Sequence, residues 1–396
     1  MLRIRSLDRV SMFRNPHPGH VGGVARSATW KAWHRNPTAG VLWACRLAFE
    51  RLCLVLLAIV SCGVGCSRGD PVGQVASTGF VPPRLADTGQ AVERALRGLG
   101  FSETVGAPTE VVRLESGVLG YSVSDNSRSP QVLSGLESLS YGTGAERIEA
   151  FGAGLNLEHV FSGHRDLHNR FCARRHPYLL CRERGGDSVF LVRLASQGPW
   201  SIEHVTRLTP AAPHSIDIDF RCRFLDASRF GSRAYAGFFW ANYMRELHDG
   251  VLQFRGTKDE DEDGGREEKW IRAEPRVGWD VGTYQASGAR PLEFDLDHNM
   301  GLNLRAFASP RFTRPFFFSR CADNMVLMLM FDRMTGPSDE IRFSSFPPAV
   351  DFQYVVRDIK PGRRYGFRAR MSWRPWVSRE DCLQEWSSWQ SSEEDR

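Results

Sequence analysis

The chain has 396 residues, and its 51 lysine and arginine residues against 46 aspartate and glutamate residues give a formal net charge of +5 at pH 7. Nine of the basic and two of the acidic residues fall in residues 1–61, so residues 62–396 contain 42 basic and 44 acidic residues. This balance excludes the basic excess typical of nucleic-acid-binding domains, and we expect no nucleic-acid partner.

Residues 1–40 are polar, rich in Arg, His, Gly and Pro, and show neither helical nor strand periodicity. We expect a disordered extension here. A misplaced start is a further hypothesis, because translation beginning at Val41 or Leu42 would leave a compact leader.

Residues 41–61 predict a secretory signal peptide. Two arginines precede the largely apolar run Leu52–Cys62, which is too short for a membrane span, since a span takes about 20 residues. Ile59–Ser61 stand directly before Cys62, and this order resembles the lipobox of bacterial lipoprotein signals. The resemblance implies cleavage before Cys62, lipid attachment to it, and a domain held at the bacterial cell envelope outside the cytoplasm.

Residues 62–87 are rich in Gly, Ser, Pro, Val and Thr, which predicts a flexible tether. Residues 88–109 predict a short helix and a linker. The apolar residues of this helix fall on one face at helical spacing, and they are Ala91, Val92, Ala95, Leu96 and Leu99.

Strand patterns dominate residues 110–377. In residues 215–224 every second residue from Ile216 to Phe224 is apolar and the residues between are charged, which is typical of a half-buried antiparallel strand. Further strands are expected over residues 111–115, 118–123, 188–194, 201–208, 235–241, 325–331, 341–346, 351–356 and 365–373. Strands do not alternate with helices, so the sequence predicts a mainly β protein, a large antiparallel β-sandwich or supersandwich with a short helix near each end.

Residues 378–396 predict a C-terminal helix and an acidic tail, with Ser378 as the N-cap and Asp381 three residues later. Two interpretations of the cysteines stay open. Cys172 and Cys181 flank a possible turn and are the pair most suited to a disulfide in an oxidising envelope, and the alternative is buried thiols.

The densest polar cluster contains His164, Asp166 and His168, which alternate and would therefore share one face of a strand. Imidazole and carboxylate groups bind zinc or another divalent metal, and they also serve as acid and base on a sugar. A polar turn whose side chains bond the backbone is the third interpretation.

Arg174, Arg175 and His176 follow within the segment Asn169–Pro177. Guanidinium groups can hold a carboxylate or a sulfate through paired hydrogen bonds, which makes these residues candidates for substrate contact. Solvated surface charge is the alternative.

Asp259, Asp261 and Asp263 match the ligand spacing in the first half of a calcium-binding loop, but Trp270 stands where the closing glutamate belongs. Calcium is the one cofactor that this spacing indicates, and a solvated hairpin insertion is the alternative. His298 follows three aligned carboxylates in Leu292–Gly301, and these residues are candidates for acid–base chemistry or metal binding. A solvated strand face is the alternative.

Aromatic rings crowd the segment Phe238–Tyr243. Exposed rings can pack on the apolar faces of sugars, whereas buried rings fill a core. Trp240, Asn242 and Tyr243 are the candidates for a sugar site, because an asparagine between aromatic residues offers orienting hydrogen bonds.

Four segments carry a family likeness, namely Gly154–Phe161, Asn169–Pro177, Trp200–Thr206 and Ser215–Phe220. At the level of strand order over Glu110–Trp373, the chain resembles the galactose mutarotase-like supersandwich group, which includes aldose 1-epimerases and sugar-binding domains. The resemblance implies a carbohydrate-facing cleft and a glycan ligand. Epimerases of this type use a histidine acid and a late glutamate base, and neither is present in the matching segments.

Three functions stay open on this basis. The first is a membrane-anchored envelope lipoprotein that binds glycan through a β-sandwich without turnover. The second is a sugar-active enzyme, of epimerase, lyase or hydrolase type, that uses a histidine and carboxylate pair. The third is a structural envelope protein.

Overall fold

The computed structural model describes residues 85–125, 133–163, 172–175, 178–248, 250–257, 267–273, 282–293 and 310–394. All of these residues belong to one compact unit, Val81–Arg396. The expected extension, the signal peptide and Cys62 lie outside the described residues and stay predictions. Among the described helices, none combines the length and the apolar character needed to cross a membrane.

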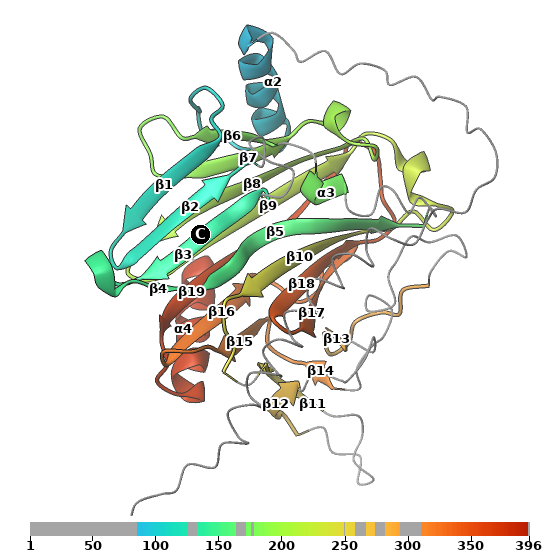
Figure 1. Ribbon diagram of the computed structural model, residues 1–396. Coiled ribbons are helices and arrows are strands. Elements are labelled where there is room, and N and C mark those ends of the chain that lie inside the picture. The colour runs from blue at the N-terminus through green and yellow to red at the C-terminus, as the bar shows by residue number, and fades with distance from the viewer. Residues whose placement is uncertain are drawn as a thin grey trace, which may run out of the picture. The chain divides into compact units, whose positions relative to one another are not determined.

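The described strands form two sheets, and every strand pairing within them is antiparallel (Figure 1). The nine-stranded sheet has the order β1-β2-β3-β5-β10-β18-β17-β13, with β4 beside β3. Its strands are β1 Val111–Ser116, β2 Leu119–Ser124, β3 Gly135–Tyr141, β4 Ile148–Glu149, β5 Phe151–Ser162, β10 Ala236–Met244, β13 Thr283–Gln285, β17 Asp339–Phe346 and β18 Ala349–Val356.

The ten-stranded sheet has the order β12-β11-β15-β16-β19-β9-β8-β7-β6, with β14 beside β11. Its strands are β6 Leu179–Arg182, β7 Val189–Arg193, β8 Ile202–Ala211, β9 Ser215–Phe224, β11 Leu252–Thr257, β12 Lys269–Ala273, β14 Arg311–Phe312, β15 Phe316–Arg320, β16 Met325–Phe331 and β19 Arg364–Pro375. Short 3₁₀ helices cover Gly144–Glu146, Ala195–Gln197 and Ala227–Phe230.

The main core lies between the two sheets and is rich in aromatic rings. Phe220 of the ten-stranded sheet meets Trp240 of the nine-stranded sheet with ring centroids 5.4 Å apart, and Phe352 meets Phe367 at 5.6 Å. The alternation predicted for β9 is confirmed, because its apolar residues from Ile216 to Phe224 are all buried in this core. The predicted fold class, a mainly β sandwich-like protein with a helix near each end, is therefore confirmed.

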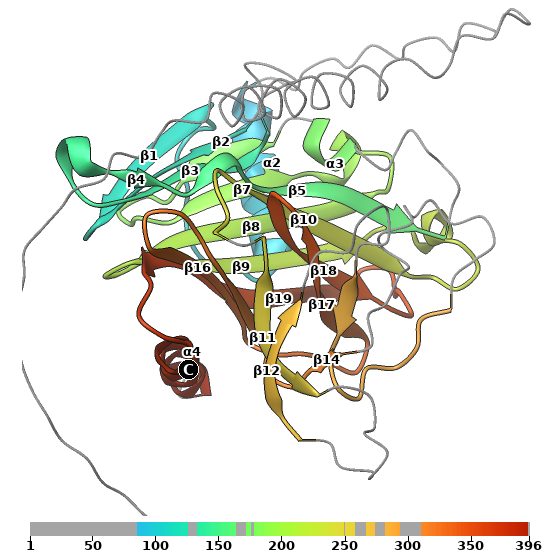
Figure 2. The same ribbon diagram turned by 60° about the horizontal axis from the view of Figure 1, so that its bottom comes forward.

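Two helices cover parts of the outer face of the ten-stranded sheet, the face turned away from the core. Helix α2 (Leu85–Gly98) packs its apolar face on β7 and β8, and helix α4 (Arg379–Glu394) packs Cys382, Trp386 and Trp389 on β15 and β16 (Figure 2). The backbone N–H of Asp381 donates to the hydroxyl of Ser378 at 3.1 Å, as expected for the N-cap. The strands β9 and β19 lie between the two covered regions.

Cys181 has a free thiol that is buried in the apolar cluster beneath α2, so of the two interpretations the buried thiol holds and the candidate Cys172–Cys181 disulfide is not formed. Apolar packing accounts for this cysteine without a partner. No disulfide joins the four cysteines with described side chains, Cys181, Cys222, Cys321 and Cys382, and all four are buried.

Candidate functional site

A β-bulge in β5 positions the central residue of the candidate site, Glu158. Across the pair of β5 and β10, Leu157 lies opposite Trp240 and His159 lies opposite Phe239, so Glu158 is an extra residue with no partner of its own in the ladder. Bulges of this kind redirect a side chain and recur next to active sites. Because of the bulge, the side chain of Glu158 departs from the regular alternation of β5 and lies near polar residues of neighbouring elements.

A second irregularity in β5 sets the position of Tyr243. Leu155 lies opposite Asn242 and Ala153 lies opposite Tyr243, which leaves Gly154 as the extra residue. A Cβ atom at Gly154 would come within 1.6 Å of the carbonyl oxygen of Leu136 on β3, so only glycine fits there. Gly154 therefore has two effects: it allows β3 to approach β5 closely, and it shifts the register between β5 and β10 next to Tyr243.

The Glu158 carboxylate is held by three side chains from three elements. The hydroxyl of Tyr243 on β10 donates to it and lies 3.0 Å from both of its oxygens. The Arg174 guanidinium of helix α3 (Cys172–Arg175) donates to Oε1, and the Nε2 atom of His159 lies 3.6 Å from Oε2. Glu158 is 4% exposed, whereas Arg174 retains 30% of its side-chain surface in solvent.

Helix α3 is fixed beside this cluster by a residue of the opposite sheet. Arg193 on β7 donates from Nη1 to the carbonyl oxygen of Ala173 at 3.0 Å, and Ala173 itself is buried in the core. The Arg193 guanidinium also lies 5.0 Å from the centre of the Tyr178 ring, a favourable cation–π contact. Arg174, the next residue along α3, is therefore presented to Glu158 from an anchored turn.

A second carboxylate, Asp351 of β18, lies close enough to interact electrostatically with Glu158. Asp351 is 2% exposed, and its Oδ1 accepts a hydrogen bond from the backbone N–H of Asn242 at 3.4 Å. In the register of the sheet, Ser344 lies opposite Asp351, and Thr283 lies opposite Ser344. A line of buried polar side chains thus continues from Asp351 across β17 and β13.

Burial raises the pKa values of both carboxyl groups. For Asp351, burial and the nearby charge of Glu158 raise the pKa well above its usual range, against a weaker effect of the Asn242 backbone hydrogen bond. For Glu158, burial also raises the pKa, and Arg174 and Tyr243 oppose the increase. Two coupled carboxyl groups near one arginine favour a state in which Asp351 keeps its proton and Glu158 carries the charge.

Four of the residues predicted for a site have described side chains, and they separate into two groups. Arg174 and Tyr243 both bind Glu158 and belong to the candidate site. Trp240 lies in the core, where its ring stacks on Phe352 with an angle of 4° between the planes. Asn242 is fully buried and donates from Nδ2 to the carbonyl oxygen of Val350. Trp240 is only 4% exposed, so its ring packs in the core and offers no free face to a sugar.

The remaining predicted residues lie outside the described residues, and their roles stay predictions. They are the side chain of Arg175 together with Cys62, His164, Asp166, His168, His176, Asp259, Asp261, Asp263 and His298. Among the side chains that the structure does describe, no three His, Cys, Asp or Glu residues gather in a way that could hold a metal ion.

Sequence reasoning missed the two carboxylates at the centre of the site. Glu158 begins the polar segment that also contains His164, and Asp351 begins the strand expected over residues 351–356, where polar and apolar residues alternate. Alternation of that kind is typical of a solvated face, yet Asp351 and Gln353 are buried. The one sequence signal available was the pair of glycines at 152 and 154, which marks an irregular strand.

Comparisons with known proteins give weak structural likenesses alone. No known protein family and no curated protein sequence matches the chain. A GalM/aldose epimerase homologue from C. elegans is similar over 69% of this chain and 100% of its own length, with 8% identity and a TM-score of 0.35. A mutant of the heparan sulfate lyase HepC from Pedobacter heparinus is similar over 74% of this chain, with 6% identity and a TM-score of 0.33, and the chain spans 41% of that protein.

Proposed function

We propose that this protein acts on a carbohydrate by proton transfer, with Glu158 as the acid–base group. The observation that carries the proposal is the cluster around Glu158, a buried carboxylate at a bulge, bound by Tyr243 and Arg174 and coupled to Asp351. Coupled carboxyl groups with displaced pKa values are typical of sites that transfer protons. An isolated surface carboxylate lacks every one of these properties.

Each residue of the cluster has a distinct part in this chemistry. Glu158 gives or takes the proton, and its raised pKa brings it closer to neutral pH, where a general acid or base is most effective. Arg174 and Tyr243 orient the carboxylate, and Arg174 also balances its charge. Asp351 keeps a proton beside Glu158 and limits the negative charge of the cluster.

Two considerations support a carbohydrate as the ligand. Sugar hydroxyl groups both donate and accept hydrogen bonds, which matches a cluster that presents a carboxylate, a phenol and a partly exposed guanidinium side by side. The sequence likeness of segments such as Gly154–Phe161, which contains Glu158, to the galactose mutarotase-like group supports the same class of ligand.

The experiment is an activity screen of the full-length chain with neutral and acidic mono- and oligosaccharides. NMR follows anomeric exchange, a reducing-end assay follows hydrolysis, and ultraviolet absorbance follows elimination. We expect Glu158→Gln to lower kcat/KM at least about 100-fold, the usual contribution of a general acid or base. Glu203→Gln is the matched control, because Glu203 is also buried and bound to an arginine, Arg223, but on the other sheet. Equal activity in wild type and Glu158→Gln would refute the assignment.

Glycan binding without turnover is the second candidate. It is favoured because both carboxylate oxygens of Glu158 already accept hydrogen bonds. Tyr243 lies within hydrogen-bond distance of both carboxylate oxygens and Arg174 occupies one of them, which leaves little freedom to protonate a substrate. Under this candidate the wild type binds a glycan, converts none of the sugars in the screen, and loses affinity when Arg174 is replaced by glutamine.

We also propose that Cys62 carries the lipid that holds the domain at a bacterial envelope. The support is the order of Ile59, Val60, Ser61 and Cys62 in the sequence. Metabolic labelling with an alkyne fatty acid tests the site. Cys62→Ser is expected to abolish labelling and Cys66→Ser to leave it unchanged, and labelling that survives Cys62→Ser would refute the assignment.

A further inference from the structure

A cavity of about 370 Å³ opens on the outer face of the ten-stranded sheet, over β9 and β19. Leu99, at the end of α2, forms one wall, and residues Asp332 to Asp339, which join β16 to β17, form another. Its volume falls within the range of small-molecule pockets, about 300 to 1,000 Å³. This site is separate from Glu158, which belongs to the other sheet.

Gly366 lies in the lining of the cavity, at a point where β19 closely approaches the backbone of β9. Gly366 of β19 lies opposite Arg221 of β9, and a Cβ atom at this position would come within 2.1 Å of the carbonyl oxygen of Phe220. Arg364 and Arg368 stand two residues to either side of Gly366 and therefore project from the same face of β19. Three arginines thus surround a position where only glycine fits.

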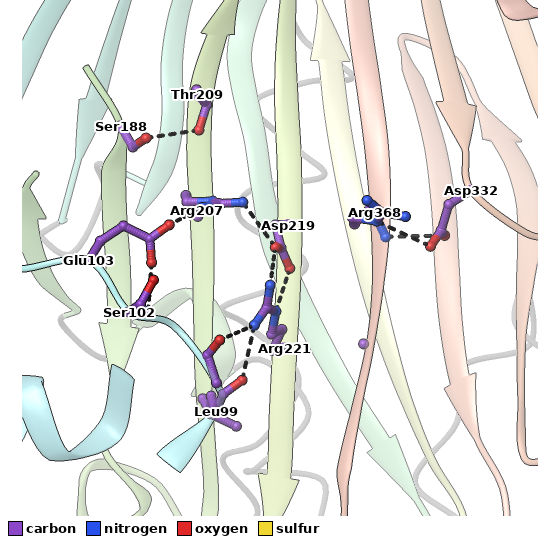
Figure 3. A network of polar contacts seen from close by, with 12 residues as sticks. Leu99, Ser102, Glu103, Ser188, Arg207, Thr209, Asp219, Arg221, Asp332 and Arg368 are labelled. Atoms are coloured by element: carbon purple, nitrogen blue, oxygen red, sulfur yellow. Dashed lines mark hydrogen bonds and ion pairs between the residues drawn. The ribbon is translucent and has the colours of Figure 1, made fainter. Parts of the chain in front are cut away.

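Among the residues that line the cavity, arginines outnumber aspartates, and one of these arginines, Arg368, also pairs with Glu393 at 2.6 Å. Five arginines line it, at positions 221, 333, 363, 364 and 368, against three aspartates at 219, 332 and 339. Figure 3 shows how two of the aspartates are already engaged: Asp219 binds Arg207 and Arg221, and Asp332 binds Arg368. Asp332 also lies 3.6 Å from Arg333.

Arg221 is held firmly and forms part of the wall. Its Nε and Nη2 atoms donate to the two oxygens of Asp219 at 2.9 and 2.7 Å, and its Nη1 atom donates to the carbonyl oxygen of Gly100 at 2.6 Å. The guanidinium also lies 4.0 Å from the centre of the Phe101 ring. Arg221 therefore contributes a fixed positive surface to the cavity without needing a ligand to order it.

Two further arginines at the cavity have no carboxylate partner among the described residues. Arg363 contacts the ring of Tyr365 at 5.3 Å and forms no ion pair in that part of the chain. Arg364 likewise forms none, and its guanidinium occupies the space that a side chain at Gly100 would take. Two exposed guanidinium groups beside a cavity with fixed arginines favour an anionic occupant, because arginine binds carboxylate, sulfate and phosphate groups with paired hydrogen bonds.

We infer that this cavity binds a small organic oxyanion, a molecule of about one sugar ring that carries a carboxylate, sulfate or phosphate group. Arg364 and Arg363 hold the anionic group at the edge of the cavity. The hydroxyl of Ser338 and the carboxylate of Asp219 lie at the wall and meet hydroxyl groups of the ligand. The inference is independent of the acid–base chemistry assigned to Glu158.

Isothermal titration of the full-length chain in detergent tests this inference, with glucuronate, glucose, sulfate and phosphate as separate probes. Glucose has the same ring as glucuronate without the carboxylate, so it isolates the contribution of the charge. We expect saturable binding of glucuronate and none of glucose. Arg364→Gln is expected to weaken binding about 10-fold, the value of one charged hydrogen-bonding group.

Arg113→Gln is the matched control, since Arg113 is exposed on β1 of the other sheet and its removal changes the net charge equally. Glu158→Gln should also leave anion binding unchanged, which separates this inference from the proposed catalytic role. Binding of sulfate and phosphate as well as glucuronate would assign a general oxyanion site, and binding of glucuronate alone would assign a uronate site. The inference is overturned if none of the three anions binds at about 10 mM, a concentration that would reveal a millimolar Kd, or if Arg113→Gln weakens binding as much as Arg364→Gln.

Discussion

Replacement of Glu385 by glutamine should weaken the attachment of helix α4 to the ten-stranded sheet. Burial would raise the pKa of Glu385, but hydrogen bonds from His214 and Ser372 and the charge of Arg374 lower it to about 2. Ser372 Oγ donates to Oε1 at 2.6 Å, and Arg374 donates to the other oxygen. These contacts join the middle of α4 to β19.

The expected loss of stability follows from that pKa. Each pKa unit corresponds to about 1.4 kcal/mol, so a pKa of about 2 instead of 4.5 means that ionised Glu385 stabilises the fold by about 3 kcal/mol. The carboxyl pKa is lowered by folding, so the stabilisation is complete above the unfolded pKa and is lost as pH falls toward about 2. The free energy of unfolding of Glu385→Gln should therefore lie about 3 kcal/mol below that of the wild type at pH 7, and the gap should narrow in acid.

Urea denaturation from pH 7 down to the most acidic pH at which the wild type stays folded measures this gap. Glu380→Gln is the matched control, because Glu380 is exposed on the same helix and its replacement removes the same charge. We expect the control to change the free energy of unfolding by less than about 0.5 kcal/mol, as for most surface substitutions. A gap for Glu385→Gln that is absent at pH 7, or that stays constant as pH falls, would refute the reasoning.

Three further predictions, with four substitutions, test other parts of the structure. Asp351→Asn should raise the free energy of unfolding at pH 8 but not at pH 4. Folding raises the pKa of Asp351, so above the unfolded pKa the carboxyl group ionises more readily in the unfolded state, and this favours unfolding of the wild type. Lower stability of the variant at pH 8, measured in urea, would contradict this. Gly154→Ala should cost about 3 kcal/mol or more, since the new Cβ would lie 1.6 Å from a carbonyl oxygen, whereas Gly89→Ala in α2, with nothing within 4 Å, should stabilise by about 0.5–1 kcal/mol; thermal denaturation of both variants checks the contrast. Trp386→Ala should cost about 3–5 kcal/mol, because the indole stacks on Phe316 at 5.3 Å, and an unchanged melting temperature would show that α4 is not part of the cooperative fold.

The sequence was informative where a residue's environment depends on its near neighbours in the chain. The alternation in β9 predicted its buried face because strand periodicity is local, and Ser378 predicted the start of α4 because an N-cap acts within one turn. The expected strand over residues 215–224 coincides with β9.

The candidate site could not be predicted in the same way, because its residues come together through long-range pairing. Glu158 and Tyr243 are 85 positions apart in the chain, and their contact depends on register shifts between β5 and β10. Asp351 has the sequence environment of a solvated strand residue, and its burial is decided by what covers the sheet. The sequence also could not show that Trp240 is buried, because a buried and an exposed aromatic residue have the same sequence pattern.

The bulge at Glu158 has a consequence for how this site arises and is lost in evolution. Because Glu158 is an extra residue of its strand, deleting its single codon would let His159 follow Leu157 opposite β10 without a bulge at this point. The deletion removes the carboxylate while the neighbouring hydrogen-bonded pairs keep their partners. Gene variants with one residue fewer at this point would therefore be expected to fold and to lack the chemistry, so the scaffold and the acid–base group can be inherited separately.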